Sequence, residues 1–216
     1  MSFQVMIQQL GSGMVRTVGI FALTLLFSLP LGLLVAFGRM SRNRIVRSIV
    51  WVYISIMRGT PLMLQLLAVY FGPYYIARIK LGQMWRFAAI IIAFSINYAA
   101  YFAEIYRSGI ESMPPGQYEA AKILGYSKTS TFFRIIFPQV VKRILPSVTN
   151  EVITLVKDTS LAFSLAYAEM FTLAKQIAAK EKSFMPFLAA AVFYYVFNAL
   201  VAFGMERIEK SMDYYT

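Results

Sequence analysis

The chain has 216 residues, of which 59% are hydrophobic and 14% are charged, and its formal net charge is +11. Soluble globular proteins carry about 25% charged residues, so this composition excludes an ordinary soluble domain and indicates a lipid environment. The absence of Cys and His excludes disulfides, thiol chemistry and a nucleophile–histidine pair, and it leaves only carboxylates for a metal site.

Long apolar runs predict five membrane-spanning helices, since a bilayer core about 30 Å thick needs about 20 apolar residues per helix. The predicted spans are residues 14–38, 45–77, 85–110, a stretch within 137–167, and 187–205. The second run is too long for one straight crossing. We therefore expect an all-α integral membrane protein, with residues 1–216 forming a single transmembrane domain.

The basic residues predict the orientation of these spans. With the N-terminus outside, the inner segments hold twelve Lys and Arg residues and the outer segments hold seven. The inner set is Arg39, Arg42, Arg44, Arg47, Arg107, Lys122, Lys128, Arg134, Lys142, Arg143, Arg207 and Lys210, and the outer set is Arg16, Arg78, Lys80, Arg86, Lys175, Lys180 and Lys182. By the positive-inside rule, this distribution predicts N-out and C-in. Because these residues flank apolar runs instead of lining one face, they argue against nucleic-acid binding.

The sequence Arg58-Gly59-Thr60-Pro61 predicts a break within the second run. Gly59 and Pro61 both weaken a helix, and Thr60 can cap a new helix that has Pro61 in its first position. The second half-helix would present free N–H groups and a positive dipole end at membrane depth, which suits an anionic group. The alternative is a simple kink with Arg58 paired to a carboxylate.

Polar residues recur in the third and fourth runs, where charges are costly and are therefore functional candidates. Asn97, Tyr101 and Glu104 share one helical face, which must contact protein or a water-filled cavity. That face is either an interhelical hydrogen-bond seam or the lining of a pathway. Lys157 and Asp158 near the end of the fourth run either neutralise each other or face the same pathway.

The loop at residues 114–138 separates the third and fourth spans and is expected inside the cell. Pro114-Pro115-Gly116 ends the third span, and residues 117–124 predict a short helix that Gly125 terminates. Ser127 can cap a second short helix, and Pro138 starts the fourth span. The first short helix is too apolar for a free loop. It is either an interfacial helix on lipid headgroups or a plug for a groove on a partner protein.

The same loop resembles the EAA motif of ABC importer permeases, E-A-A-x3-G-x9-I-x-L-P. Every spacing matches, with Glu119-Ala120-Ala121, Gly125, Ile135 and Phe137-Pro138, and Phe137 replaces the usual Leu. Three further segments look like the polar amino acid branch of that family: Arg58-Gly59-Thr60-Pro61, Ala103-Glu104-x2-Arg107-x-Gly109-Ile110 and Lys157-Asp158-Thr159-Ser160-Leu161. The resemblance covers roughly residues 10–210.

The resemblance implies a type I importer fold in a prokaryotic cytoplasmic membrane, crossed several times. It assigns ATPase coupling to Tyr118, Glu119, Ala120, Ala121, Leu124 and Gly125. The implied partners are two ATPase subunits, a second permease subunit (a copy of this chain or a close relative) and an extracytoplasmic substrate-binding protein. Residues 169–182 predict an amphipathic outer segment that either receives this binding protein or lies at the membrane interface.

The implied function is the transport of polar amino acids across the membrane by alternating access. Because Glu104 and Asp158 are acidic, they favour basic amino acids as the substrates. The expected pathway residues are Arg58, Gly59, Thr60, Asn97, Tyr101, Glu104, Thr154, Lys157, Asp158 and Ser160. The sequence lacks a G-x-x-x-x-G-K-[ST] loop, so we expect no enzyme activity and no cofactor in this chain, with ATP and Mg²⁺ on the partner ATPases. The alternatives are a gradient-driven secondary amino acid transporter, which would need an internal inverted repeat, and a membrane scaffold, which would need no buried charges.

Overall fold

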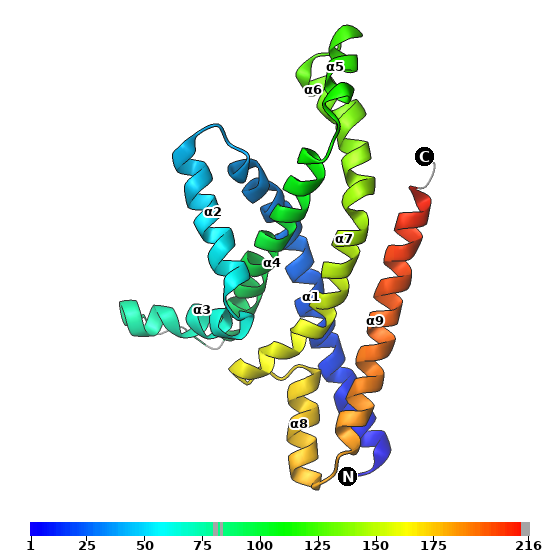
Figure 1. Ribbon diagram of the computed structural model, residues 1–216. Coiled ribbons are helices and arrows are strands. Elements are labelled where there is room, and N and C mark those ends of the chain that lie inside the picture. The colour runs from blue at the N-terminus through cyan, green and yellow to red at the C-terminus, as the bar shows by residue number, and fades with distance from the viewer. Residues whose placement is uncertain (80–81, 83, 213–216) are drawn as a thin grey trace.

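A computed structural model of the chain describes residues 1–79, 82 and 84–212, and within that part it is almost entirely helical (Figure 1). The helices in chain order are α1 (Phe3–Arg39), α2 (Arg44–Gly59), α3 (Leu62–Ala77), α4 (Trp85–Glu111), α5 (Pro115–Ile123), α6 (Lys128–Thr131), α7 (Phe137–Asp158), α8 (Met170–Glu181) and α9 (Met185–Ser211). A π-helical segment (Phe132–Ile136) joins α6 to α7, and a 3₁₀ segment (Thr159–Leu165) follows α7. The all-α fold expected from the sequence is confirmed.

Helix α4 lies at the centre, with 67% of its most apolar window buried, and α1 packs along it. The buried face of α1 consists mainly of small residues, namely Gly13, Thr17, Thr24, Ser28, Gly32 and Ala36. A Cβ on Gly32 would lie 2.8 Å from the Cβ of Phe102 on α4. Because lipid offers no hydrophobic drive for association, membrane helices need such small residues for close contact.

Helices α1, α4 and α9 are each long and apolar enough to cross a membrane, and the bent pair α2–α3 could supply a fourth span. Helices α1 and α9 are longer than the runs predicted for them at residues 14–38 and 187–205. Within the part of the chain that the structure describes, α7 is not among the helices that are long and apolar enough to cross a membrane. It lies within the stretch at 137–167 where the fourth span was expected, and it ends at Asp158, after which Ala166 adopts a left-handed conformation at φ 51°. Lys80, one of the outer basic residues, lies outside the described residues.

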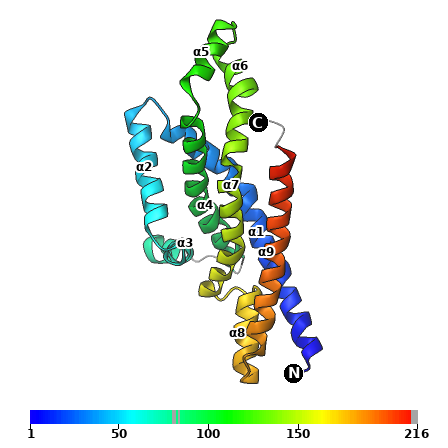
Figure 2. The ribbon, with the colours of Figure 1, turned by 45° about the vertical axis from the view of Figure 1, so that its right-hand side comes forward.

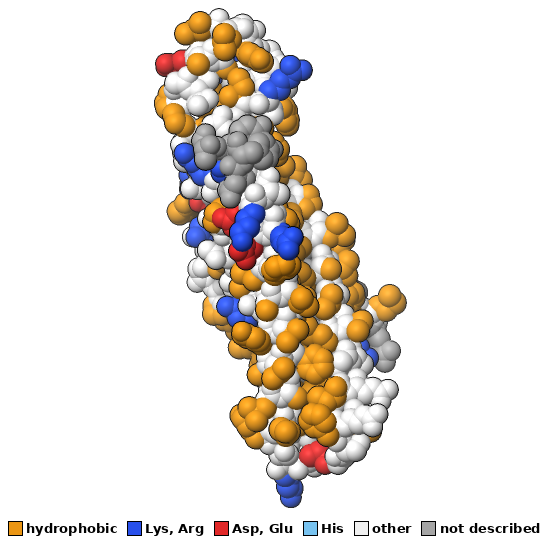
Figure 3. Space-filling view, turned by 90° about the vertical axis from the view of Figure 1, so that its right-hand side faces the viewer, with side chains coloured by type: hydrophobic (Ala, Val, Ile, Leu, Met, Phe, Trp, Pro, Cys, Tyr) orange, Lys and Arg blue, Asp and Glu red, His pale blue; other side chains and the backbone are white. Residues whose placement is uncertain are grey.

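The molecule is elongated, and its two ends differ (Figures 1 and 2). The N-terminus and α8 lie at one end, whereas α5, α6 and the C-terminal end of α9 lie at the other. On the face formed by α9, hydrophobic side chains cover most of the surface, and charged side chains gather towards the α5 end (Figure 3). The exposed apolar side chains of α9 include Leu188, Val192, Tyr195, Val196, Leu200 and Phe203. This face is suited to contact lipid.

Helix α8 corresponds to residues 169–182, where the sequence predicted an amphipathic segment, and it packs tightly against its neighbours. The buried Glu169 caps α8, accepting hydrogen bonds from the Phe171 and Thr172 amides at 2.7 Å each, and it also accepts one from the Tyr194 hydroxyl of α9 at 3.2 Å. A Cβ on Gly13 of α1 would lie 2.7 Å from the Cα of Met170. Helix α8 is therefore held tightly against α1 and α9.

Candidate functional site

The predicted break in the second run is confirmed, because the chain bends by 112° between α2 and α3. The predicted cap is wrong. Thr60 ends α2 instead of starting α3, and its hydroxyl donates to the Ile56 carbonyl at 2.8 Å. Pro61 takes the position before α3 and has no side chain that could cap it. The first turn of α3 therefore has no side-chain cap. Its N–H groups are not occupied by a capping side chain, which a binding site for an anionic group at this helix end would require.

Two buried amides brace this bend. The Gln65 side chain donates to the carbonyls of Met57 and Thr60 at 3.0 and 3.1 Å. The Asn97 side chain of α4 donates to the Gln65 oxygen at 2.9 Å and to the Met57 carbonyl at 3.1 Å. Asn97 therefore forms the interhelical seam that was one of its two expected roles. Gln65 was not predicted, although an amide within an apolar run is the signal that could have identified it.

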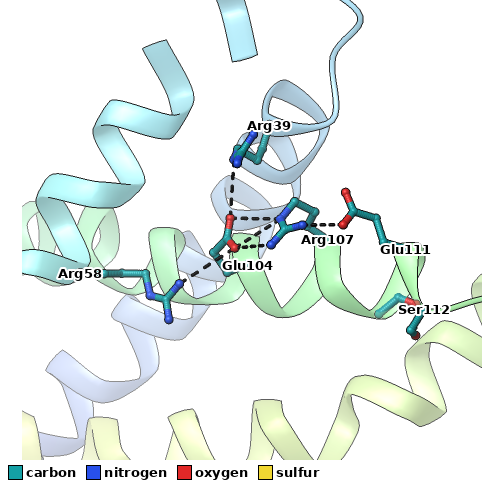
Figure 4. A network of polar contacts seen from close by, with 7 residues as sticks. Arg39, Arg58, Glu104, Arg107, Glu111 and Ser112 are labelled. Carbon is teal, nitrogen blue, oxygen red and sulfur yellow. Dashed lines mark hydrogen bonds and ion pairs between the residues drawn. The ribbon is translucent and has the colours of Figure 1, made fainter. Parts of the chain in front are cut away.

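Glu104 is the centre of a cluster of arginines that joins three helices (Figure 4). Its carboxylate pairs with Arg107 of α4 at 2.6 Å, Arg39 of α1 at 3.9 Å and Arg58 of α2 at 4.0 Å. Arg107 also pairs with Glu111. The sequence left open either a helix break or a kink in which Arg58 pairs with a carboxylate. The structure has both the break and the Arg58–Glu104 pair. One carboxylate shared by three guanidinium groups leaves this region net positive.

A cavity of about 480 Å³ lies next to this cluster, between α4 and α7. Three predicted pathway residues line it, namely Arg58, Tyr101 and Glu104, and the Arg58 guanidinium lies 5.4 Å from the centre of the Tyr101 ring. Arg143 and Glu151 of α7 also line it and were not predicted, although a charge within a predicted span is a candidate by default. The cavity presents guanidinium and carboxylate groups to the same space, and it can therefore hold a zwitterion.

The predicted residues of the fourth run do not line this cavity. Asp158 accepts a hydrogen bond from the Tyr98 hydroxyl at 2.8 Å, and among the described residues it forms no ion pair with Lys157. Thr154 and Ser160 donate to the carbonyls of Asn150 and Lys157 on their own helical turns. Lys157 and Thr154 are exposed. Across residues 1–79, 82 and 84–212, no three potential metal-ligating side chains gather at one point.

The loop after α4 extends beyond the rest of the molecule (Figure 1). Helix α5 starts two residues earlier than expected, and Gly125 then adopts φ 77°, which is the left-handed cap that the sequence predicted. The Ser127 side chain caps α6, also as predicted. Leu124 is 73% exposed, and Tyr118, Glu119 and Ala120 are exposed too. Ala121, in contrast, is buried at 1% exposure and packs against its own loop.

A family model described as the binding-protein-dependent transport system inner membrane component matches residues 28–214. The chain belongs to this family. This inner membrane component is 35% identical to the L-cystine transport system permease protein TcyB of Bacillus subtilis (strain 168), over 95% of this chain and 87% of the relative. It is also 37% identical to the putative glutamine transport system permease protein GlnP of Rickettsia conorii (strain ATCC VR-613 / Malish 7), over 93% of this chain and 91% of the relative.

Solved structures agree with this assignment. The inner membrane component superposes on a chain of an amino acid ABC transporter with histidines at a TM-score of 0.86. The two chains are 30% identical, and the match covers 98% of this chain and 99% of the other. A chain of the MetNI methionine ABC transporter in an inward-facing conformation matches at a TM-score of 0.76 and 18% identity, which shows the common fold. Members of this family are membrane permease subunits of ABC importers.

Proposed function

We propose that this inner membrane component is the permease subunit of an ATP-binding-cassette importer that moves polar amino acids by alternating access. The transport of cystine and glutamine, for which its relatives are named, supports an amino acid substrate. The observation that carries the proposal is the exposed α5 loop, which protrudes at one end and is terminated by Gly125. A protruding helix with exposed apolar side chains suits insertion into a groove of a partner, here the ATPase subunit.

Charge reversal on α5 tests this coupling. We expect Glu119→Lys and Gly125→Arg each to abolish co-purification of the ATPase subunits or to separate ATP hydrolysis from uptake. Gly125→Asn serves as a matched control, because Asn tolerates the left-handed conformation that Gly125 adopts. Glu209→Lys at the end of α9 controls for charge reversal outside the loop. Normal ATPase binding and coupled uptake in both Glu119→Lys and Gly125→Arg would refute the proposal.

The proposed substrate position is the cavity between α4 and α7. Arg58 would hold the substrate carboxylate, Glu151 would hold its ammonium group, and the Tyr101 ring would support Arg58. Hydrogen bonds to charged groups contribute about 1.5–3 kcal/mol, so Arg58→Gln and Glu151→Gln should each weaken substrate binding by about ten- to a hundredfold. Arg44→Gln, an exposed arginine at the other end of α2, is the control. Unchanged affinity measured by calorimetry in detergent would exclude this position.

The proposed topology has five spans, formed by α1, the bent pair α2–α3, α4, α7 and α9, with the N-terminus outside and the C-terminus inside. Helix α7 carries too many charges to span alone, but it packs against α4 and α9, which would shield it from lipid. The partners would be two ATPase subunits that bind ATP and Mg²⁺, a second permease subunit and an extracytoplasmic binding protein. A gradient-driven transporter is the alternative, and it would continue uptake when the ATPase subunits are removed.

A further inference from the structure

The end of the molecule that carries the N-terminus and α8 is strongly basic. The sequence contains no Asp or Glu before Glu104, so α1, α2 and α3 contribute no carboxylate. In the part of the chain that the structure describes, the acidic residues near this end are Glu169, which is buried and caps α8, and Glu181. The proposed orientation, on which this inference rests, places this end outside the cell. The positive-inside rule disfavours basic residues on the outer side, so the basic residues that this end does carry need an explanation.

A cavity of about 530 Å³ lies at this end, where α1, α3 and α4 meet the turn that precedes α8. Arg16 of α1 and Arg86 of α4 line it, together with the aromatic rings of Tyr70, Phe87 and Tyr167. Arg16 donates one hydrogen bond to the Ala168 carbonyl at 2.7 Å, and Arg86 donates one to the Ala166 carbonyl at 3.3 Å. Each guanidinium has five N–H donors, so both are held in place and still have donors to offer.

The positive charge of this cavity is not compensated. Neither Arg16 nor Arg86 forms an ion pair within the part of the chain that the structure describes. Among the described residues that line the cavity none is acidic, and the carboxylate of Glu169, which follows Ala168, is buried and accepts the hydrogen bonds that cap α8. Two fixed guanidinium groups with free donors form the kind of site that binds a phosphate or carboxylate group.

The surroundings favour a phosphate at the depth of lipid headgroups. Trp85 donates its indole N–H to the Tyr70 carbonyl at 3.0 Å, and the rings of Phe87 and Tyr167 stack with centres 5.6 Å apart. Tyr75 on α3, which contacts the rings of Phe71 and Tyr74, is 67% exposed. Trp and Tyr gather at the membrane–water interface, where phospholipid phosphates also lie.

We propose that this cavity binds the phosphate of an anionic phospholipid from the outer leaflet. Arg16 and Arg86 donate to the phosphate oxygens, and the aromatic rings flank the glycerol and upper acyl chain. Because both arginines also hold the carbonyls at Ala166 and Ala168, the lipid stabilises the turn that connects the 3₁₀ segment after α7 to α8. Bound lipid would thereby fasten the outer ends of three helices to one another.

The test is lipid retention by the transporter purified with its natural partner subunits. Native mass spectrometry after exchange into phosphatidylglycerol or phosphatidylcholine nanodiscs should show phosphatidylglycerol retained by the wild type. Arg16→Gln combined with Arg86→Gln should lower that retention by about tenfold or more, since each basic residue contributes about 1 kcal/mol to binding of an anionic lipid. The Lys175→Gln and Lys180→Gln pair, also exposed at this end but outside the cavity, should retain phosphatidylglycerol as the wild type does.

A measurement on the wild type covers the case in which the arginine variant fails to fold. Short-chain phosphatidylglycerol should raise the unfolding temperature of the transporter more than short-chain phosphatidylcholine does. Equal shifts, or equal loss of lipid from the arginine and lysine variants, would overturn the proposal. Displacement of the lipid by excess amino acid substrate would also overturn it, in favour of a carboxylate site. Lipid retention does not depend on transport, so it can fail while the proposed function holds.

Discussion

At the scale of single residues, side-chain amides and guanidinium groups hold the broken part of the chain in one geometry. Gln65 and Asn97 satisfy backbone carbonyls that the break between α2 and α3 leaves without helical partners. Glu104 links Arg39, Arg58 and Arg107 across three helices. Irregular backbone at membrane depth survives only when protein groups satisfy it, which is why these polar residues cluster at the bend.

Replacing Gln65 tests this bracing role. Gln65→Leu removes the donors to Met57 and Thr60 and deprives Asn97 of one partner, so the free energy of unfolding should fall by about 1–2 kcal/mol. Thermal unfolding of the purified transporter in detergent would measure it. Gln8→Leu, at an exposed position of α1, should leave the unfolding temperature unchanged. Equal behaviour of the two variants would contradict the bracing role.

At the scale of helices, the crossing of α4 and α7 connects the cavity to the coupling loop. A Cβ on Gly109 of α4 would lie 2.2 Å from the Cγ2 of Ile144 on α7 and 3.2 Å from the Cγ1 of Val140. Ile144 lines the polar cavity on one side of this crossing and an apolar cavity of about 500 Å³ on the other. Movement of the α5 loop would pass to the cavity through this contact.

A double-mutant cycle tests the crossing. Gly109→Ala should force α4 and α7 apart and lower the free energy of unfolding by about 1–3 kcal/mol. Adding Ile144→Ala should restore part of that loss, because it removes the side chain that the new methyl group meets. Gly204→Ala on α9, where a Cβ meets nothing within 4 Å, should be neutral or slightly stabilising. Strictly additive effects of the two substitutions would show that the helices do not meet there.

At the scale of the whole molecule, the α5 loop lies at one end of an elongated helical bundle and α8 at the other (Figures 1 and 2), and the basic aromatic cavity adjoins the turn that precedes α8. Helix α9 presents an apolar face to lipid between them (Figure 3). Only 6% of the most apolar window of α9 is buried, against 67% for α4, so α9 lies at the surface of the bundle and α4 forms its protected interior.

Thiol labelling tests the orientation, because the chain has no Cys of its own. Ala179→Cys in α8 should react with a membrane-impermeant maleimide in intact cells, whereas Thr129→Cys in α6 should react only after permeabilisation. Both side chains are exposed. The reverse pattern would show that the N-terminus lies inside and would also place the lipid cavity in the inner leaflet.

Much of the fold and part of the site could be predicted from local sequence. Gly59 and Pro61 both weaken a helix, so the break was predictable, as were the left-handed Gly125 and the Ser127 cap. The role of Thr60 was not, because two helix ends adjoin it and only the three-dimensional path decides which one it serves. Glu151 and Gln65 were missed, since neither belongs to a local motif, and contacts with other helices give them their place.

By itself, the sequence determined that this chain belongs in a membrane, that it is helical, and that the loop after α4 turns at Gly125 and restarts at Ser127. These follow from composition and from backbone preferences that act over a few residues. Only the tertiary structure decided which polar groups meet. It directed Asn97 to the bend, gathered three arginines on Glu104, and brought Arg16 and Arg86 to one cavity. Residues on four different helices take part, and their meeting depends on how the small residues of α1 and α4 let those helices pack.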